Sequence, residues 1–423
     1  MMDKPKVIVA HPGRQHSFRV AKALKDGGML YKYATTVYNK ESSILMRIIK
    51  LFLNKDNYDR AQRRKCNDLK DDDVVQFCEI DGLLLLALQR IDFTRYFSVK
   101  YNGYISRKFQ RKLAKYIINN NVDAVVSYDT NSAILFRLLK ANAPQVKLIM
   151  DNAHPNRHYL YHSYHEHWDS VGDFYRTLDA CGYLTNEERS EKFGLEAKLA
   201  DYHIVASSYS EKALVYDNIP LDNIYRVPYG VDKNKFLEPK RVYDGKQLTV
   251  LFVGEVNQRK GIKQVLEAAK RINSEDVIFN IVGSGREYCA DLYEPYKPYV
   301  NFMGRVPFSE LLNQLQTSHV FIFPTMGEGF GLVLLEAMAA GLPVITTANC
   351  GGADIVSEGD NGFLIDACDE NALISKIKWF LNNQDKMQRM SKRAIETARL
   401  FTWERYESGI VNAVSNIINR KKL

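Results

Sequence analysis

The sequence lacks the features expected of a membrane-spanning or disulfide-bonded protein. No apolar run approaches the roughly 20 residues that cross a bilayer. The apolar residues at the start are too few for a signal peptide and lead into a predicted strand at residues 6–10. The six cysteines are scattered, with no pair at the spacing of a zinc site. We therefore expect a cytoplasmic chain without disulfides and without a bound metal.

Two further motifs are missing. The glycines at 283 and 285 follow a predicted strand, but the third glycine of a dinucleotide-binding fingerprint is absent. The formal net charge of +8 would suit a nucleic acid, yet no recognisable nucleic-acid-binding motif accompanies it. We therefore expect neither an NAD cofactor nor a nucleic-acid partner.

Short apolar runs alternate with helical patterns along the chain, which indicates an α/β fold with parallel sheets. The 423 residues are enough for two domains, each with its own core. A polar stretch at residues 224–244, containing proline and glycine, is the predicted connection between them. The predicted strands are 6–10, 74–78, 122–127, 146–150, 201–207, 248–254, 277–283, 319–323 and 344–347.

The stretch between the last two predicted strands is the most informative. It comprises a glycine-rich turn and an apolar helix that begins near Gly331, and its only charges are Glu328 and Glu336. Both carboxylates can face one cleft at the carboxyl end of the preceding strand, where parallel sheets bind ligands. Gly329 and Gly331 allow close approach of a ligand, and the free N–H groups of the helix start favour a diphosphate. A buried helix with a charged cap would explain Glu328, but it would leave Glu336 without a partner.

A second cluster of charge lies in another predicted strand-to-helix turn. Arg259 and Lys260 directly precede Gly261, at the start of a predicted helix. Two adjacent cations beside a glycine at a helix start suit a diphosphate. Exposed cations on a surface turn are the alternative.

Residues 328–336 resemble the E-x7-E motif of the family 4 retaining glycosyltransferases (glycosyl transferases group 1), and the similarity covers most of residues 207–403. The resemblance implies the GT-B fold, in which two Rossmann-like, doubly wound domains face each other across a deep cleft. Residues 1–230 would then form the acceptor-side domain and residues 231–402 the domain that binds the nucleotide sugar. The C-terminal helix at 403–423 would pack back on the first domain.

The resemblance also assigns roles to individual residues. Glu328 and His154 would be catalytic and lie at the donor sugar. His154 is not followed by the usual aspartate, and Glu255 stands where an arginine is common, with Arg259 as the replacement cation. His154 could instead be an ordinary histidine of a turn. The first strand-to-helix turn, which contains Gly13, could have no ligand. The donor-binding residues carried over are Gly13, Arg259, Lys260, Arg305, Val306, Gly329, Phe330, Gly331, Leu332 and Glu336, with Arg14, Gln15 and His16 as neighbours of Gly13.

The implied activity is transfer of a hexose from a nucleoside diphosphate sugar, with retention of configuration and without metal or cofactor. UDP and GDP both remain open. The acceptor would be a glycan or a lipid-linked molecule in the assembly of a bacterial-type surface polysaccharide or glycolipid. Two other classes remain: a sugar-nucleotide 2-epimerase of the same fold, and a non-catalytic relative that binds carbohydrate or lipid.

Four further stretches have a composition that could suit a ligand. Residues 43–54 are predicted to form an apolar helix with Arg47 and Lys50 on one stripe, which would suit either the inner face of an anionic membrane or a core. Residues 40–115 hold 17 basic and 10 acidic side chains, including the cluster at 60–65. Residues 71–73 show a D-x-D pattern that we interpret as a solvated loop. The His- and Tyr-rich stretch at 158–168 suits an acceptor surface or an aromatic helix face.

Overall fold

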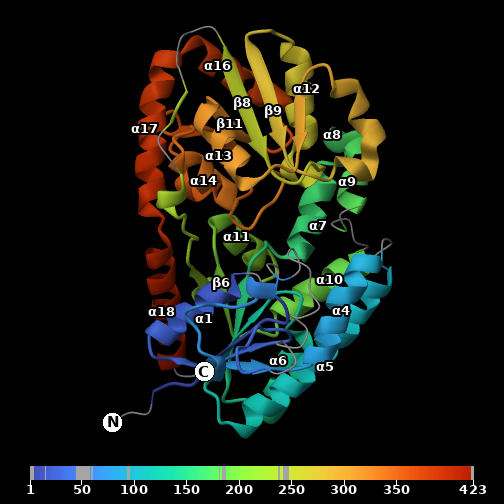
Figure 1. The fold of residues 1–423 in the computed structure, drawn as a ribbon, viewed down its shortest axis with the longest axis vertical. Coiled ribbons are helices and arrows are strands. Elements are labelled where there is room, and N and C mark those ends of the chain that lie inside the picture. Colours follow the sequence, from blue (N-terminus) through green and yellow to red (C-terminus); the bar gives the residue numbers. More distant parts are fainter. Residues whose placement is uncertain are drawn as a thin grey trace.

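The computed structural model contains two parallel β-sheets, one in each half of the chain (Figure 1). This confirms the predicted α/β architecture of two Rossmann-like domains. The structure describes residues 4–14, 16–43, 58, 61–92, 96–180, 182, 187–236, 239–241 and 247–420.

The first sheet has seven strands in the order β3-β2-β1-β4-β5-β6-β7, so it is doubly wound about β1 and β4. Alternate residues of β1 face opposite cores: Val7 and Val9 pack on one side, Ile8 and Ala10 on the other. The strands are β1 (Val7–Ala10), β2 (Leu30–Thr35), β3 (Val74–Gln76), β4 (Ala124–Tyr128), β5 (Lys147–Asn152), β6 (Tyr202–Val205) and β7 (Ile224–Arg226).

Helices cover both faces of this sheet. One core contains side chains of α1 and α18, and the other contains side chains of α5 and α6. The principal helices of this half are α1 (Ser17–Asp26), α4 (Glu79–Ile91), α5 (Tyr96–Asn119), α6 (Ala133–Asn142), α7 (Arg157–Glu166), α8 (Trp168–Val171), α9 (Tyr175–Ala180), α10 (Glu187–Ala197) and α11 (Ser208–Tyr216).

The second sheet has the order β10-β9-β8-β11-β12-β13, which repeats the doubly wound pattern. Its strands are β8 (Leu248–Val253), β9 (Val277–Val282), β10 (Asn301–Gly304), β11 (Val320–Phe323), β12 (Val344–Thr347) and β13 (Gly362–Ile365). Its helices are α12 (Ile262–Ile272), α13 (Phe308–Thr317), α14 (Leu332–Ala339), α15 (Gly352–Ile355), α16 (Glu370–Asn382) and α17 (Gln384–Leu400).

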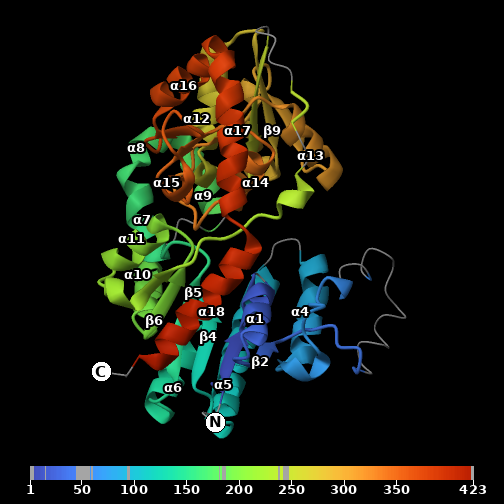
Figure 2. The ribbon, with the colours of Figure 1, turned by 90° about the vertical axis from the view of Figure 1, so that its left-hand side faces the viewer.

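The chain returns to the first half at its end. Helix α18 (Trp403–Asn419) packs against α1, and Figure 2 shows it running down alongside the first sheet. Lys22 and Arg19 of α1 both form ion pairs with Glu407 of α18. The last helix therefore ties the second half of the chain to the first.

Three local predictions need correction or comment. Ser17 is the first residue of α1 rather than its cap, and its hydroxyl donates to the Arg14 carbonyl. Residues 71–73 form a short 3-10 helix rather than an open loop, with Asp73 ion-paired to Lys25.

The predicted helix at 44–53, with Arg47 and Lys50, lies outside the described residues, as do Gln15 and Arg60. In the described part of the chain, every helix is too short or too polar to cross a bilayer.

Candidate functional site

The second domain places one carboxylate against two cations. The Arg259 Nη1 lies 2.5 Å from Glu328 Oε2, and the Lys260 Nζ contacts the same oxygen. Arg259 and Lys260 are only 7% and 9% exposed. A second carboxylate, that of Glu255, lies 3.9 Å from Arg259 Nη2 at the rim. Two buried cations therefore share one buried carboxylate.

These charges perturb one another. Burial alone would raise the pKa of Glu328, but Lys260 and Arg259 outweigh burial and hold that pKa well below its usual range. Burial lowers the pKa of Lys260, and the attraction of Glu328 opposes this only in part. Glu328 is therefore ionised at neutral pH, and the cluster has a buried excess of positive charge.

Backbone contacts between two turns bring these side chains together. Arg259 and Lys260 lie in a 3-10 turn after β8, and Glu328 lies in the turn after β11. The Arg259 carbonyl accepts from the Met326 N–H at 2.9 Å and from the Thr325 hydroxyl at 2.8 Å. Gly261 has φ +73°, and a Cβ there would lie 2.0 Å from the Pro324 carbonyl oxygen. Only glycine permits this approach of the two turns.

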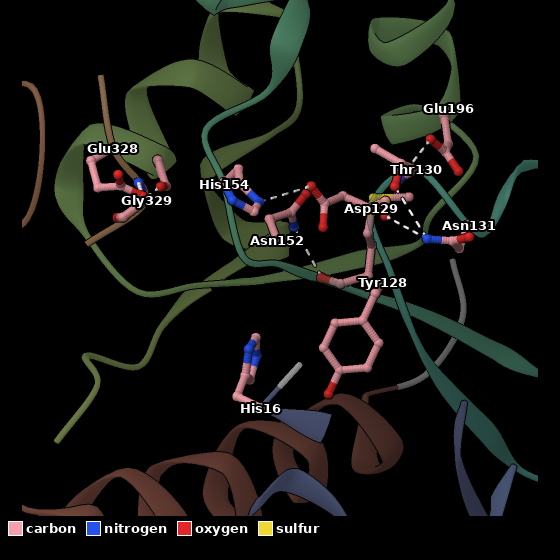
Figure 3. A network of polar contacts seen from close by, with 12 residues as sticks. His16, Tyr128, Asp129, Thr130, Asn131, Asn152, His154, Glu196, Glu328 and Gly329 are labelled. Atoms are coloured by element: carbon pink, nitrogen blue, oxygen red, sulfur yellow. Dashed lines mark hydrogen bonds and ion pairs between the residues drawn. The ribbon is translucent and has the colours of Figure 1, made fainter. Parts of the chain in front are cut away.

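The turn after β11 also touches the first domain. A Cβ on Gly329 would lie 2.1 Å from the Ala153 carbonyl oxygen, directly after β5. The Gly329 carbonyl accepts from the hydroxyls of Ser207 and Ser210, at the start of α11. The carboxyl ends of the two sheets therefore face each other at this point, and Figure 3 shows Glu328 and Gly329 on the same side of the network as His154.

His154 lies on the first-domain side of this contact, in the turn that follows β5. Its Nδ1 is 3.8 Å from Asp129 Oδ2, and its side chain is 39% exposed (Figure 3). His154 is also close enough to Glu328 to contribute to lowering the pKa of that carboxyl. Asp129 was not predicted as a site residue, although it directly follows β4, at the carboxyl edge where parallel sheets bind ligands.

The predicted helix start is present, but part of its backbone is already hydrogen-bonded. Gly331 is the N-cap of α14, with φ +82° and no side-chain cap. The Phe330 carbonyl accepts from the Gly351 N–H, and its buried ring packs against Tyr229 with centroids 5.7 Å apart. Leu332 is half-buried. Gly329 and Phe330 stay predicted donor-binding residues, although the carbonyl groups of both accept hydrogen bonds within the protein.

Glu336 and Glu328 have different charged neighbours. Burial raises the pKa of Glu336, while Lys235 in the segment between the domains lowers it to a smaller extent. The cations next to Glu328 are instead Lys260 and Arg259. The structure therefore does not join the two glutamates in one ion-pair network.

The other predicted donor-binding residues lie in two turns, one in each domain: Gly13 in the first, and Arg305 and Val306 in the second. The Gly13 N–H donates to His11 Nδ1 at 2.8 Å, so this group is used within the first turn. Arg305 is exposed beyond β10, and its Nη2 donates to the Ser284 hydroxyl at 3.2 Å. Val306 next to it is half-buried. Arg305 lies at the carboxyl edge of the second sheet, whereas Gly13 lies at that of the first.

A buried ion pair beside the first turn was not predicted. His16 Nε2 lies 2.9 Å from Asp151 Oδ2, and Tyr229 of the connecting segment lies next to the imidazole. Burial alone would lower the pKa of His16, but Asp151 outweighs it and raises that pKa. Tyr406 of α18 packs against Tyr229. The pair therefore lies where the first domain, the connection and the last helix meet.

No metal site is found among the described residues, where no three His, Cys, Asp or Glu side chains converge. The His-rich stretch forms α7, in which His158 pairs with Asp217 at 2.5 Å and contacts His162. Leu160 and Tyr164 of the same helix pack beside Gly327. This helix therefore supports the turn that carries Glu328.

Arg259, Lys260 and Glu328 lie in the part of the chain that matches a known protein family. Residues 233–397 match the family Glycosyl transferases group 1. The chain is 29% identical over 192 residues to the capsular polysaccharide biosynthesis glycosyltransferase CapM of Staphylococcus aureus, covering 43% of this chain and 50% of that protein. It is 30% identical over 178 residues to the phosphatidyl-myo-inositol mannosyltransferase of Mycobacterium leprae, covering 40% and 46%. The matched segment thus spans about half the length of these relatives.

The fold similarity extends further than the sequence similarity. HepE of Anabaena, solved in complex with UDP-glucose, superimposes with a TM-score of 0.61 at 14% identity, covering 97% of this chain and 99% of that chain. The architecture is therefore that of the GT-B glycosyltransferases, as the sequence predicted.

Proposed function

We propose that this chain, whose second domain matches Glycosyl transferases group 1, transfers a hexose from a nucleoside diphosphate sugar to an acceptor bound at the first domain. The buried cluster of Arg259, Lys260 and Glu328 carries this proposal. Its two cations share one buried carboxylate at the carboxyl end of the second sheet, where a doubly wound fold binds nucleotides. The relatives named as glycosyltransferases, and HepE with its bound UDP-glucose, support the choice of donor.

The chemistry follows from where charge develops. As the bond between the sugar and the diphosphate breaks, negative charge grows on the leaving diphosphate, and preorganised cations stabilise it. Arg259 and Lys260 would supply this stabilisation, together with the N–H groups at the start of α14. Glu328 and His154 would face the sugar, and Glu336 would accept hydrogen bonds from the ribose. This division of labour requires no divalent metal, and we extend the proposal to retention of configuration.

We propose a chemical class for the acceptor, a surface glycan or a lipid-linked glycan. The first domain would present it from the side of His154 and Asp129, across the contact between Gly329 and Ala153. A surface glycan or a lipid-linked glycan at the inner face of the cell membrane would suit the relatives, one of which is named for capsular polysaccharide and one for phosphatidyl-myo-inositol.

The test is a screen of UDP- and GDP-sugars for release of the nucleoside diphosphate, with and without candidate acceptors. We expect one donor to be consumed faster when an acceptor is present, and the anomeric configuration of the product to match that of the donor. Conversion of a donor to an epimer without acceptor would favour the 2-epimerase class instead. Failure of every donor to bind would refute the proposal.

A further inference from the structure

Helices α4 and α5 form a hairpin that reaches past the carboxyl edge of the first sheet. Helix α4 begins just after β3, at that edge, whereas α5 must return to the opposite edge to lead into β4. The 24 residues of α5 extend about 36 Å, while a strand of six residues extends only about 20 Å. Figure 1 shows α4 and the adjoining part of α5 at the level where the two domains meet. The hairpin therefore flanks the site on its acceptor side.

The hairpin exposes apolar side chains to solvent. A groove of about 730 Å³ lies between its helices, and all but one of its lining residues are aliphatic or aromatic. Ile91 is 71% exposed and Phe97 is 65% exposed. Exposed apolar surface of this kind marks an interaction site. The lining residues are Leu84, Ala87, Leu88, Ile91, Phe97, Lys100, Tyr101 and Tyr104.

Lys100 lines this groove, and further cations lie along the two helices that form it. Within residues 79–119 the sequence has eight basic and three acidic side chains. Of the described acids in this range, Asp81 is ion-paired with Lys108, and Asp92 accepts from the Ser98 N–H. Six of the cations are exposed and form no ion pair with any described residue: Arg90, Lys100, Arg107, Arg111, Lys112 and Lys115.

We propose that the α4–α5 hairpin docks onto an anionic lipid bilayer, with Ile91 and Phe97 inserted and the surrounding cations at the headgroups. The apolar side chains would enter the hydrocarbon boundary of the bilayer, while the cations beside them would contact the anionic headgroups. A second copy of this chain fits less well, because a two-fold contact would bring the same cations together. The inference rests on the proposed function, since it places the acceptor-side domain against the membrane that would carry a lipid-linked acceptor.

The experiment is flotation of the full chain with phosphatidylcholine vesicles, with and without phosphatidylglycerol, at low and raised salt. Wild type should bind only the anionic vesicles, less so as salt rises. Ile91→Ser/Phe97→Ser should lower the bound fraction about ten-fold or more, from the lost apolar burial. Lys100→Glu/Arg107→Glu should lower it about thirty-fold or more, because each cation near an anionic surface contributes about five-fold. These side chains are exposed, so the variants should fold.

Matched controls lie in the same domain. Leu195→Ser/Leu221→Ser removes apolar side chains that are 54% and 60% exposed, and Arg137→Glu/Lys140→Glu reverses two exposed cations of α6. Both controls should bind vesicles like wild type. Wild type that stays unbound, or hairpin variants that bind as well as the controls, would overturn the proposal. A fall in oligomeric mass in Ile91→Ser/Phe97→Ser would assign the groove to a second copy instead. Nucleotide binding without vesicles is measured separately, so its failure would count against the proposed function alone.

Discussion

Replacing Glu328 by glutamine should destabilise the free protein and strengthen its response to nucleotide. The substitution removes the carboxylate that Arg259 and Lys260 share, so Lys260 loses its ion pair and Arg259 keeps that with the rim carboxylate of Glu255. Breaking a buried ion pair in this way costs about 3–5 kcal/mol. We expect a cost near the lower end of this range. Burial already lowers the pKa of Lys260, so Lys260 can release its proton when Glu328 is lost and avoid a buried unpaired charge.

This loss of stability can be measured as a fall in the melting temperature. For a unit of this size, about 3 kcal/mol corresponds to a fall of roughly 6–12 °C in the unfolding midpoint of the second domain. Saturating UDP or GDP should then recover more of the loss in Glu328→Gln than it adds to wild type, because the diphosphate takes the place of the missing Glu328 carboxylate beside the two cations. The assay is differential scanning fluorimetry with and without nucleotide.

The control is Asp360→Asn, which breaks an exposed pair with Arg393 in the same domain. Such surface pairs contribute about 0–1 kcal/mol, so its midpoint should barely move. A Glu328→Gln variant that melts with wild type, and gains no more from nucleotide, would refute the assignment of this cluster as the diphosphate site. The stabilisation from Glu328 should also persist at neutral pH and disappear only as the pH falls below the ordinary glutamate range, because its folded-state pKa is lowered.

Three further predictions concern other parts of the site. Glu336→Ala should weaken nucleoside diphosphate binding by about 1.5–3 kcal/mol in isothermal titration calorimetry, and an unchanged affinity would remove Glu336 from the site. Turnover should survive EDTA, whereas loss that Mn²⁺ restores would contradict a metal-independent mechanism. Asp151→Asn should lower the melting midpoint more at pH 6 than at pH 9, because Asp151 raises the pKa of His16 and that stabilisation is lost as pH rises through it. An equal fall at both pH values would show that the pair does not titrate as described.

The strands were largely predictable because a parallel strand buried on both faces is an apolar run. Strands β2, β7, β10 and β13 were not predicted. Lys32 interrupts the apolar run of β2, whose amino-terminal half is only half-buried, and β7 and β10 are half-buried or exposed along their length. The strand-to-helix turns were also predictable, since glycine with positive φ at positions such as 261 and 331 is required there.

The contacts between segments that are far apart in the sequence could not be predicted from local pattern. Arg259 and Glu328 are 69 residues apart, and Asp151 and His16 are 135 apart. Each pair joins two segments of the same domain, so it depends on the order of the strands within one sheet, which periodicity within a single element does not encode.

The most direct test of the account is nucleotide binding by the variant Arg259→Met/Lys260→Met/Glu328→Gln. Removing all three charges together leaves none of them buried without a partner, so the variant should fold, as replacement of whole buried ion clusters commonly allows. We predict that the nucleotide that stabilises wild type in a thermal shift assay gives no shift with this variant. A shift equal to that of wild type would contradict the claim that this cluster binds the diphosphate.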